Sequence, residues 1–267
     1  MLALAAGVLQ AGVYGLDTTS KEEFLTCARD LAGKCDVLVV AGGDGSLSDI
    51  INAIDIRERP IAYIPLGSGN AMSYALHIHG SINEVATQIR EGRVHEFDLI
   101  QCDEKRLAYM VSIGLEGSVI KKRDAYKARG TSGFRAYLMA FLDAYVKDFK
   151  GVRASIAVAG RSLETGSLLS LMIMKQPYYG YGLKVMPGAR LDDGRLHIRL
   201  LPTGVISSLV GGVTSLTVGN RAGSYLMGER VSVALERPLP MQADGDVAWT
   251  AKEFQFRVLP GALKMKV

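Results

Sequence analysis

The hydrophobic positions of the first hundred residues alternate between short continuous runs and runs with helical spacing. Two continuous apolar runs, residues 37–41 and 60–64, contain β-branched side chains and predict buried strands. Apolar residues at helical spacing follow each run and predict helices near Leu47 and from Ala71 onward. This alternation is typical of a doubly wound α/β domain with a parallel sheet.

Helix and turn signals extend this pattern on both sides. Ser20 and Glu23 have the spacing of a capping box, which predicts a helix that begins after Ser20. Residues 12–16 predict a short strand before that helix, and residues 82–90 predict a helix closed by Gly92. We therefore expect a first domain over residues 1–94.

The pattern changes after residue 94. Residues 96–102 and 107–113 predict two strands joined by a polar turn, and residues 134–147 predict a helix. Short runs between turn residues then predict strands at 152–159, 163–174, 195–201, 230–236 and 253–258. This spacing is typical of an antiparallel β-sandwich, so we expect a β-rich second domain over residues 95–267. Its last strand is expected to return to the first domain, with a cleft between the two.

The composition excludes several classes of protein. Hydrophobic residues make up 48% of the 267 residues and the mean hydropathy is +0.16, which excludes a disordered chain. No apolar run reaches the ~20 residues of a membrane span, and the apolar start carries no Lys or Arg that would mark a secretory signal. A net charge of +4 is too small to indicate nucleic acid, but it suits phosphate ligands or an anionic membrane surface.

The cysteines and histidines give no sign of a metal site. The three cysteines are odd in number and lack metal-ligand spacing, which indicates reduced thiols in a cytoplasmic protein. The four histidines are scattered, so we expect no metal or catalytic role for them.

The first predicted strand ends in a glycine loop made of Gly42, Gly43, Asp44, Gly45 and Ser46. Glycines at such a junction let backbone N–H groups face an anion and let a ligand approach without obstruction by a Cβ. The Asp44 carboxylate would repel phosphate unless it meets a metal ion or a hydroxyl proton, which favours a catalytic role. The alternative is an ordinary strand-ending turn, with Ser46 as a plain helix cap.

The second predicted strand ends in a similar loop made of Gly67, Ser68, Gly69 and Asn70. Because the carboxyl ends of parallel strands share one edge of a sheet, the two loops are expected to wall one ligand site. Asn70 either lines this site or caps the following helix. Neither loop has the Walker A or dinucleotide-binding pattern.

Five segments in order resemble the diacylglycerol kinase catalytic-domain superfamily, which includes bacterial lipid kinases, sphingosine kinases and ceramide kinases. They are the two glycine loops and residues 178–194, 241–246 and 258–263. The resemblance implies an α/β domain like that of NAD kinase and phosphofructokinase, followed by a β-rich lipid-binding domain. It also implies transfer of the ATP γ-phosphate to a lipid hydroxyl.

The resemblance implies roles for individual residues. Asp44 and Asp246 are the implied catalytic carboxylates, which activate the lipid hydroxyl or organise Mg²⁺ and ATP. The implied nucleotide contacts are Gly42, Gly43, Gly45, Ser46, Gly67, Ser68, Gly69, Asn70, Arg129, Arg135, Asp244 and Gly245. Without the resemblance, residues 244–246 are an ordinary hairpin turn and residues 121–129 are a solvated basic segment.

A structural Mg²⁺ site is also implied. Asp193 matches a position that the superfamily links to this ion, and backbone carbonyls near Arg190 and Arg195 would complete an all-oxygen site. A turn aspartate without a metal is the alternative.

Three departures from the superfamily pattern keep the function open. No Asn-Pro-x-Ser-Gly loop precedes the matched region, Ser118 replaces an aspartate of the sphingosine kinases, and Asp246 replaces a glutamate. The leading interpretation is an ATP-dependent lipid kinase at the inner face of the membrane, acting on diacylglycerol or a related lipid, sphingoid bases included. The alternatives are an inactive relative that binds nucleotide or lipid, and a soluble-substrate kinase of the NAD kinase type.

A homodimer is a further expectation. The apolar N-terminal segment predicts an exposed sheet edge, and such an edge pairs readily with a second chain.

Overall fold

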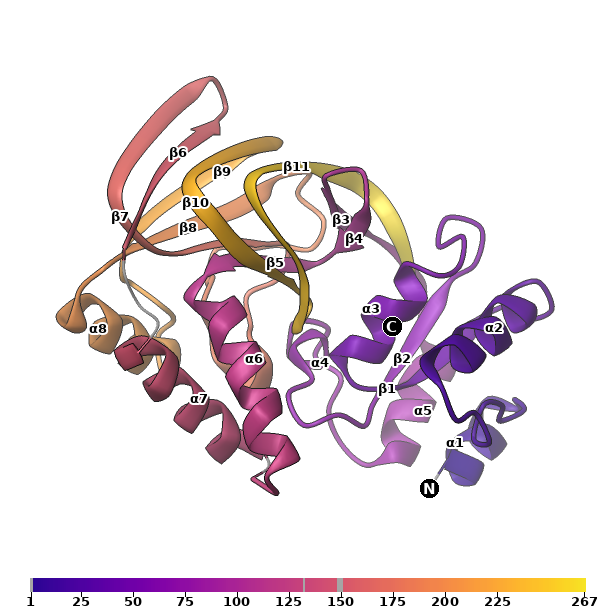
Figure 1. Cartoon of the computed structure of the whole chain (residues 1–267). Helices are drawn as coiled ribbons and strands as arrows, with labels where there is room; N and C mark the ends of the chain where they lie inside the picture. Colours follow the sequence, from indigo (N-terminus) through magenta and orange to yellow (C-terminus); the bar gives the residue numbers. More distant parts are fainter. Residues whose placement is uncertain (1, 132, 148–150) are drawn as a thin grey trace.

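The computed structural model describes residues 2–131, 133–147 and 151–267, which form two halves side by side (Figure 1). Helices α1 to α5 lie around short parallel strands in the first half, on the right of Figure 1. In the second half, long antiparallel strands curve over α6, α7 and α8. One sheet runs through both halves in the strand order β1-β2-β11-β10-β5-β7-β8-β9.

The first half contains the two predicted units of strand, loop and helix. Strands β1 (Leu38–Gly42) and β2 (Ile61–Pro65) pair in parallel. The helices are α2 (Lys21–Ala32), α3 (Asp44–Ile51), α4 (Ala71–Ala75) and α5 (Ile82–Glu91). Helix α2 begins as predicted because Ser20 Oγ accepts the N–H of Glu23 at 3.2 Å, although the Glu23 carboxylate reaches back to Thr19.

Two predictions for the N-terminal segment were wrong. Residues 12–16 form no strand, because Gly15 has a φ of 75°, a left-handed conformation that bends the chain. The preceding residues form helix α1 (Leu2–Leu9) rather than a sheet edge, because alanine and leucine are strong helix formers. Ala5 is buried in the core and α1 packs against α5.

The second half is built mainly from antiparallel strands. They are β3 (Val94–Cys102), β4 (Arg106–Ala108), β5 (Met110–Gly114), β6 (Val152–Val158), β7 (Arg161–Met174), β8 (Leu196–Pro202), β9 (Ser224–Gly228), β10 (Arg230–Ala243) and β11 (Asp246–Lys266). Strands β10 and β11 extend well beyond the predicted runs. Strand β11 pairs with β10 and β3 and then, at Met265, with Ile61 of β2, so it enters the sheet of the first half.

The run at 107–113, predicted as one strand, is interrupted at Tyr109. The Asp244 carboxylate accepts the N–H groups of Tyr109 at 3.1 Å and Met110 at 3.0 Å. Since a buried amide needs one acceptor, these two amides bond to a side chain at the point where the ladder breaks. A residue far along the chain therefore overrides the local apolar pattern.

Three helices lie under the sheet of the second half (Figure 1). They are α6 (Leu115–Ala128), α7 (Gly133–Lys147) and α8 (Val205–Ser215). Only α7 was predicted. Helix α6 includes most of the basic segment that was interpreted as solvated, and its apolar positions, Leu115, Val119 and Ile120, are buried.

Candidate active site

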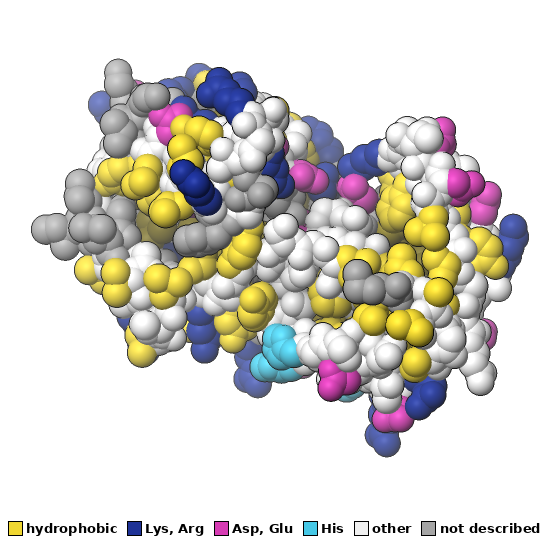
Figure 2. Space-filling model, turned by 90° about the horizontal axis from the view of Figure 1, so that it is seen from below, with side chains coloured by type: hydrophobic (Ala, Val, Ile, Leu, Met, Phe, Trp, Pro, Cys, Tyr) yellow, Lys and Arg dark blue, Asp and Glu magenta, His cyan; other side chains and the backbone are white. Residues whose placement is uncertain are grey.

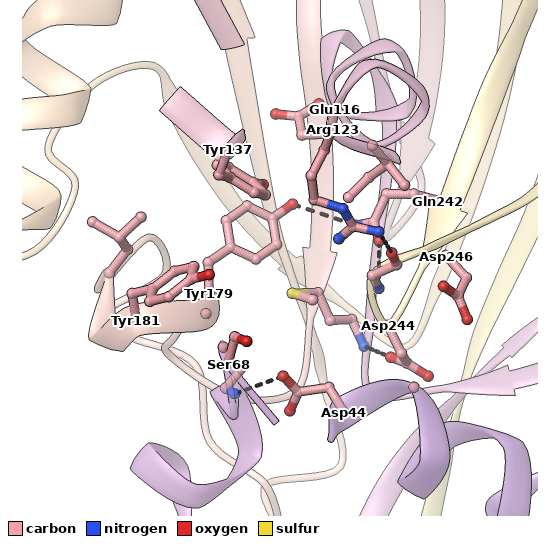
Figure 3. Close-up of a pocket in the computed structure, with 18 of the residues that line it drawn as sticks. Asp44, Ser68, Glu116, Arg123, Tyr137, Tyr179, Tyr181, Gln242, Asp244 and Asp246 are labelled. Carbon is pink, nitrogen blue, oxygen red and sulfur yellow. Dashed lines mark hydrogen bonds between the residues drawn. The ribbon is translucent and has the colours of Figure 1, made fainter. Parts of the chain in front are cut away.

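A pocket of about 260 Å³ lies between the two halves (Figure 3). The pocket is lined by residues from the start of α3, the second glycine loop, α6, α7, the loop after β7 and the β10–β11 turn. Asp44 and Ser68 lie at one end, Glu116 lies toward the other, and Tyr179 lies between them. The Arg123 guanidinium reaches the carbonyl of Gly245 at 3.4 Å, next to Asp246. The pocket thus joins both predicted glycine loops to the second half.

The glycines of the loops are required by close backbone contact. A Cβ on Gly67 would lie 2.6 Å from the Cα of Gly43, and a Cβ on Gly180 would lie 3.0 Å from the Cα of Gly69. The first loop therefore packs on the second, and the second packs on the short helix η1 (Gly180–Gly182). The N-cap of α3 is Gly43, which has no side chain to accept the first amides, so these amides remain as donors at this wall.

Asp44 links the two loops directly. Its carboxylate accepts the N–H groups of Ala71 at 2.9 Å and Met72 at 3.2 Å, and so caps α4 from the first loop. Asn70 makes no side-chain cap bond, and its amide donates to the carbonyl of Gly67 at 2.7 Å. Burial raises the pKa of Asp44, while its hydrogen bonds to the two amides oppose the rise. Asp44 thus has a structural role that the sequence had not indicated.

Asp246 begins β11 and lies over the first loop. Its Oδ2 is 3.6 Å from the position that a Cβ on Gly45 would take. Unlike Asp44, its half-buried carboxylate accepts no hydrogen bond from residues 2–131, 133–147 or 151–267. Both of its oxygens are therefore available to a ligand in the pocket.

Asp244 comes from the same turn but is fully buried. One carboxylate oxygen accepts the amides of Tyr109 and Met110, and the other accepts the hydroxyl of Ser48 at 2.6 Å. Burial raises the pKa of Asp244 to about 7. The resemblance implied a nucleotide contact for Asp244, which lines the pocket, and its hydrogen bonds also tie the turn to α3 and β5.

One face of α6 points into the pocket. It consists of Glu116, Ile120, Arg123 and Lys127, which share a helical stripe. Arg129 and Arg135, the implied phosphate contacts, are exposed and do not line the pocket. The stripe was visible in the sequence as spacings of four, three and four residues, but it was missed because residues 121–129 were not interpreted as a helix.

The end of the pocket remote from the glycine loops is lined by Tyr137 and the buried Glu116, while Tyr179 and Tyr181 flank Gly180 and line the wall between this end and the second loop (Figure 3). Glu116 Oε1 accepts the hydroxyl of Ser170 at 2.6 Å, whereas its buried Oε2 has no partner in the described part of the chain. Burial raises the pKa of Glu116 to about 7. Aromatic walls with few polar groups suit a ligand that is largely apolar.

Asp193 lies outside this pocket, and its neighbours do not fit a Mg²⁺ ion. The ammonium of Lys175 lies 2.7 Å from Asp193 Oδ1 and 2.6 Å from the carbonyl oxygen of Arg195. The expected cation position between these oxygens is thus filled by a side chain. Arg190 contributes its N–H to His197 Nε2 at 3.3 Å.

The chain is similar to proteins of known families. Residues 6–102 match the model of the diacylglycerol kinase catalytic domain, and residues 109–267 match the YegS C-terminal NAD kinase beta sandwich-like domain. A protein of Stenotrophomonas maltophilia named "Probable lipid kinase YegS-like" is 28% identical over 86% of this chain and 78% of its own length. A diacylglycerol kinase of Staphylococcus saprophyticus is 26% identical over 82% and 73%.

Solved structures share the fold. A diacylglycerol kinase from Bacillus anthracis superposes with a TM-score of 0.76 at 20% identity, over 93% of this chain and 83% of that one. An ATP complex of an NAD kinase from Archaeoglobus fulgidus superposes with a TM-score of 0.53 at 15% identity, over 100% and 88%. The predicted α/β half followed by an antiparallel β-sandwich-like half is confirmed. No helix in the described residues is long and apolar enough to cross a bilayer.

Proposed function

Because this chain belongs to the family that joins a diacylglycerol kinase catalytic domain to a YegS C-terminal domain, we propose that it is an ATP-dependent lipid kinase. The observation that carries this function is the available carboxylate of Asp246, which lies beside the first glycine loop in a pocket that the second loop and three tyrosines also line. Phosphoryl transfer needs such a combination of an anion site, a base and an acceptor site.

The glycine-loop end of the pocket is the proposed phosphate site. Uncapped amides at the start of α3 favour an anion there, because they form the positive end of the helix dipole. Arg123 and Lys127 reach the same pocket from α6 and would stabilise the charge of the transferred phosphoryl group. In this proposal they take the role first assigned to Arg129 and Arg135.

Asp246 is the proposed general base. It would accept the proton of the lipid hydroxyl while the hydroxyl oxygen bonds to the γ-phosphorus and ADP leaves. Asp44 positions both loops through its bonds to α4. The oxygen-only donors of Asp44 and Asp246 fit a Mg²⁺ ion bound together with ATP, and such an ion would neutralise phosphate charge.

The peripheral membrane surface that a lipid kinase needs is proposed on α7 and α8. Figure 2 shows hydrophobic side chains on the half of the molecule that carries these helices, as well as on the other half. Exposed apolar residues in this region are Leu138, Met139, Leu142, Val210, Val213, Leu216 and Val218. A patch of this kind next to a lipid site is expected at a membrane contact, here at the cytoplasmic face.

A homodimer also remains a proposal. Strand β1 stands at one end of the sheet order, so one of its edges lacks a strand partner among the described residues. Such an edge favours pairing with a second chain. Light scattering of the purified protein would measure the mass and decide between monomer and dimer.

The function is tested by phosphate transfer from labelled ATP. Diacylglycerol, monoacylglycerol, ceramide and sphingosine are offered in detergent micelles, and NAD is offered in solution. A labelled lipid is the expected product. Transfer to NAD alone would identify a soluble-substrate kinase, and ATP binding without transfer to any acceptor would identify an inactive relative.

A further inference from the structure

A buried ammonium group lies where the resemblance implied a structural metal ion. Lys175 follows the last residue of β7, and its side chain is 0% exposed. Its Nζ lies 2.6 Å from the carbonyl oxygen of Arg195, 2.7 Å from Asp193 Oδ1 and 2.9 Å from Asp98 Oδ2. The ammonium donates hydrogen bonds to the Arg195 carbonyl and to Asp193 Oδ1, and it forms an ion pair with Asp98.

The acceptors come from separate parts of the fold. Asp98 lies in β3, and its carboxylate also accepts the N–H of Gly261 in β11 at 3.0 Å and of Gly194 at 2.7 Å. Asp193 lies in the turn before β8. The ammonium therefore ties β3 and β11 to the end of β7 and to this turn. We call this group of Lys175, Asp98, Asp193 and the Arg195 carbonyl the lysine junction.

The lysine junction leaves no room for a divalent cation in the same place. Mg²⁺ needs about six oxygen ligands at roughly 2.0–2.1 Å, and it would have to lie among the oxygens that Lys175 already bonds. Two cations so close together would also repel each other strongly in a buried site. No group of three or more His, Cys, Asp or Glu side chains among the described residues has the geometry of a metal site.

The buried Lys175 ammonium is needed to offset the negative charge of the neighbouring carboxylates. The Asp98 carboxylate is 4% exposed and the Asp193 carboxylate is 22% exposed. Two carboxylates so placed need a cation between them, because removing one partner of a buried ion pair leaves an uncompensated charge. Either a bound metal ion or a positively charged side chain can supply this cation. We propose that the Lys175 ammonium permanently replaces the structural divalent cation implied at Asp193, so that folding of the lysine junction requires no metal.

The first test uses the unaltered protein without nucleotide. Thermal unfolding midpoints are compared in excess EDTA and in millimolar MgCl₂, and the metal content of the dialysed protein is measured. We expect equal midpoints and no stoichiometric metal. One tightly held Mg²⁺ or Ca²⁺ per chain, or a midpoint that falls in EDTA, would overturn the proposal whether or not the protein proves to be a lipid kinase.

The second test removes the ammonium group from the cation position. Lys175→Ser is expected to lower the unfolding midpoint in EDTA by about 10 °C, because it leaves the buried Asp98 carboxylate without a cation and removes the ammonium from Asp193. Millimolar MgCl₂ should raise the unfolding midpoint of this variant by several degrees, since Mg²⁺ can occupy the emptied site. It should not change the midpoint of the control Lys252→Ser, where the lysine is exposed. Failure of MgCl₂ to raise the midpoint of a folded Lys175→Ser would show that the site does not suit a divalent cation. That result would also overturn the proposal. If the variant does not fold, the proposal is decided by the test on the unaltered protein.

Discussion

The pocket and the lysine junction each contain carboxylates in or near an Asp-Gly turn, but only the pocket leaves some of them without a partner among the described residues. In the pocket, Asp246 and Glu116 Oε2 have no partner among the described residues. In the lysine junction, Asp98 and Asp193 share an ammonium and bond backbone amides as well. The Asp-Gly motif alone therefore does not indicate a ligand site. A carboxylate oxygen that has no hydrogen-bond partner within the fold is the feature that favours ligand binding over a role in stability.

The largest expected effect is on Asp246. Asp246→Asn should lower kcat by about 10²–10⁴-fold, the usual contribution of a general base, with little change in the unfolding midpoint. Phosphate transfer and thermal unfolding are measured together, with the exposed Asp17→Asn as the control. A variant that keeps full kcat would remove Asp246 from the chemistry.

The next effect concerns the buried Glu116. Its pKa is raised from 4.5 to about 7 in the folded state, so ionisation favours the unfolded chain as the pH rises between these values. The free energy of unfolding should therefore fall by about 3 kcal/mol more in the unaltered protein than in Glu116→Gln over this range. Urea unfolding at several pH values measures this, and parallel pH profiles would contradict the assignment.

A smaller effect is expected from the basic stripe of α6. Arg123→Met or Lys127→Met should raise the KM for ATP by about tenfold, since each loses a charge beside the phosphates, equivalent to about 1.4 kcal/mol. The matched control is Arg135→Met, an exposed residue of α7 that does not line the pocket. Equal effects at Arg123 and Arg135 would indicate a general charge effect instead of a phosphate contact.

The smallest effect is on stability at Asp44. Asp44→Ala removes the acceptor of two α4 amides, and loss of a helix cap costs about 1 kcal/mol. Urea unfolding should detect this loss beside the loss of turnover. An unchanged stability would show that the α4 amides find other acceptors, which would leave Asp44 with the catalytic role alone.

The sequence predicted best what depends on neighbouring residues. Strands β1 and β2, the glycine loops and α5 follow from local apolar spacing and caps, and the two loops are among the five segments that carried the family resemblance. The missed features depend on distant partners. Nothing near Asp44 in sequence indicates that it caps α4, and nothing near Asp193 indicates that Lys175 neutralises it. The break at Tyr109 has the same origin, because Asp244 supplies the acceptor from another strand.

The α6 stripe is a different case, since its information was local. Glu116, Ile120, Arg123 and Lys127 repeat at helical spacing, but the charges between them made the segment resemble a solvated loop. A helix whose polar side lines a ligand pocket lacks the usual division between an apolar face and a solvent face.

The path of β11 has a consequence for synthesis of the protein. Met265 pairs with Ile61 of β2, and the preceding residues of β11 pair with β3. The sheet of the first half therefore includes residues of β11 that leave the ribosome long after β2 and β3. Until then β2 pairs with β1 alone and β3 with β4 alone, so each lacks its second neighbour, and pairing between such distant segments is slow. The nascent chain therefore spends most of its translation with an open sheet, the interval in which chaperones would have their main opportunity to bind.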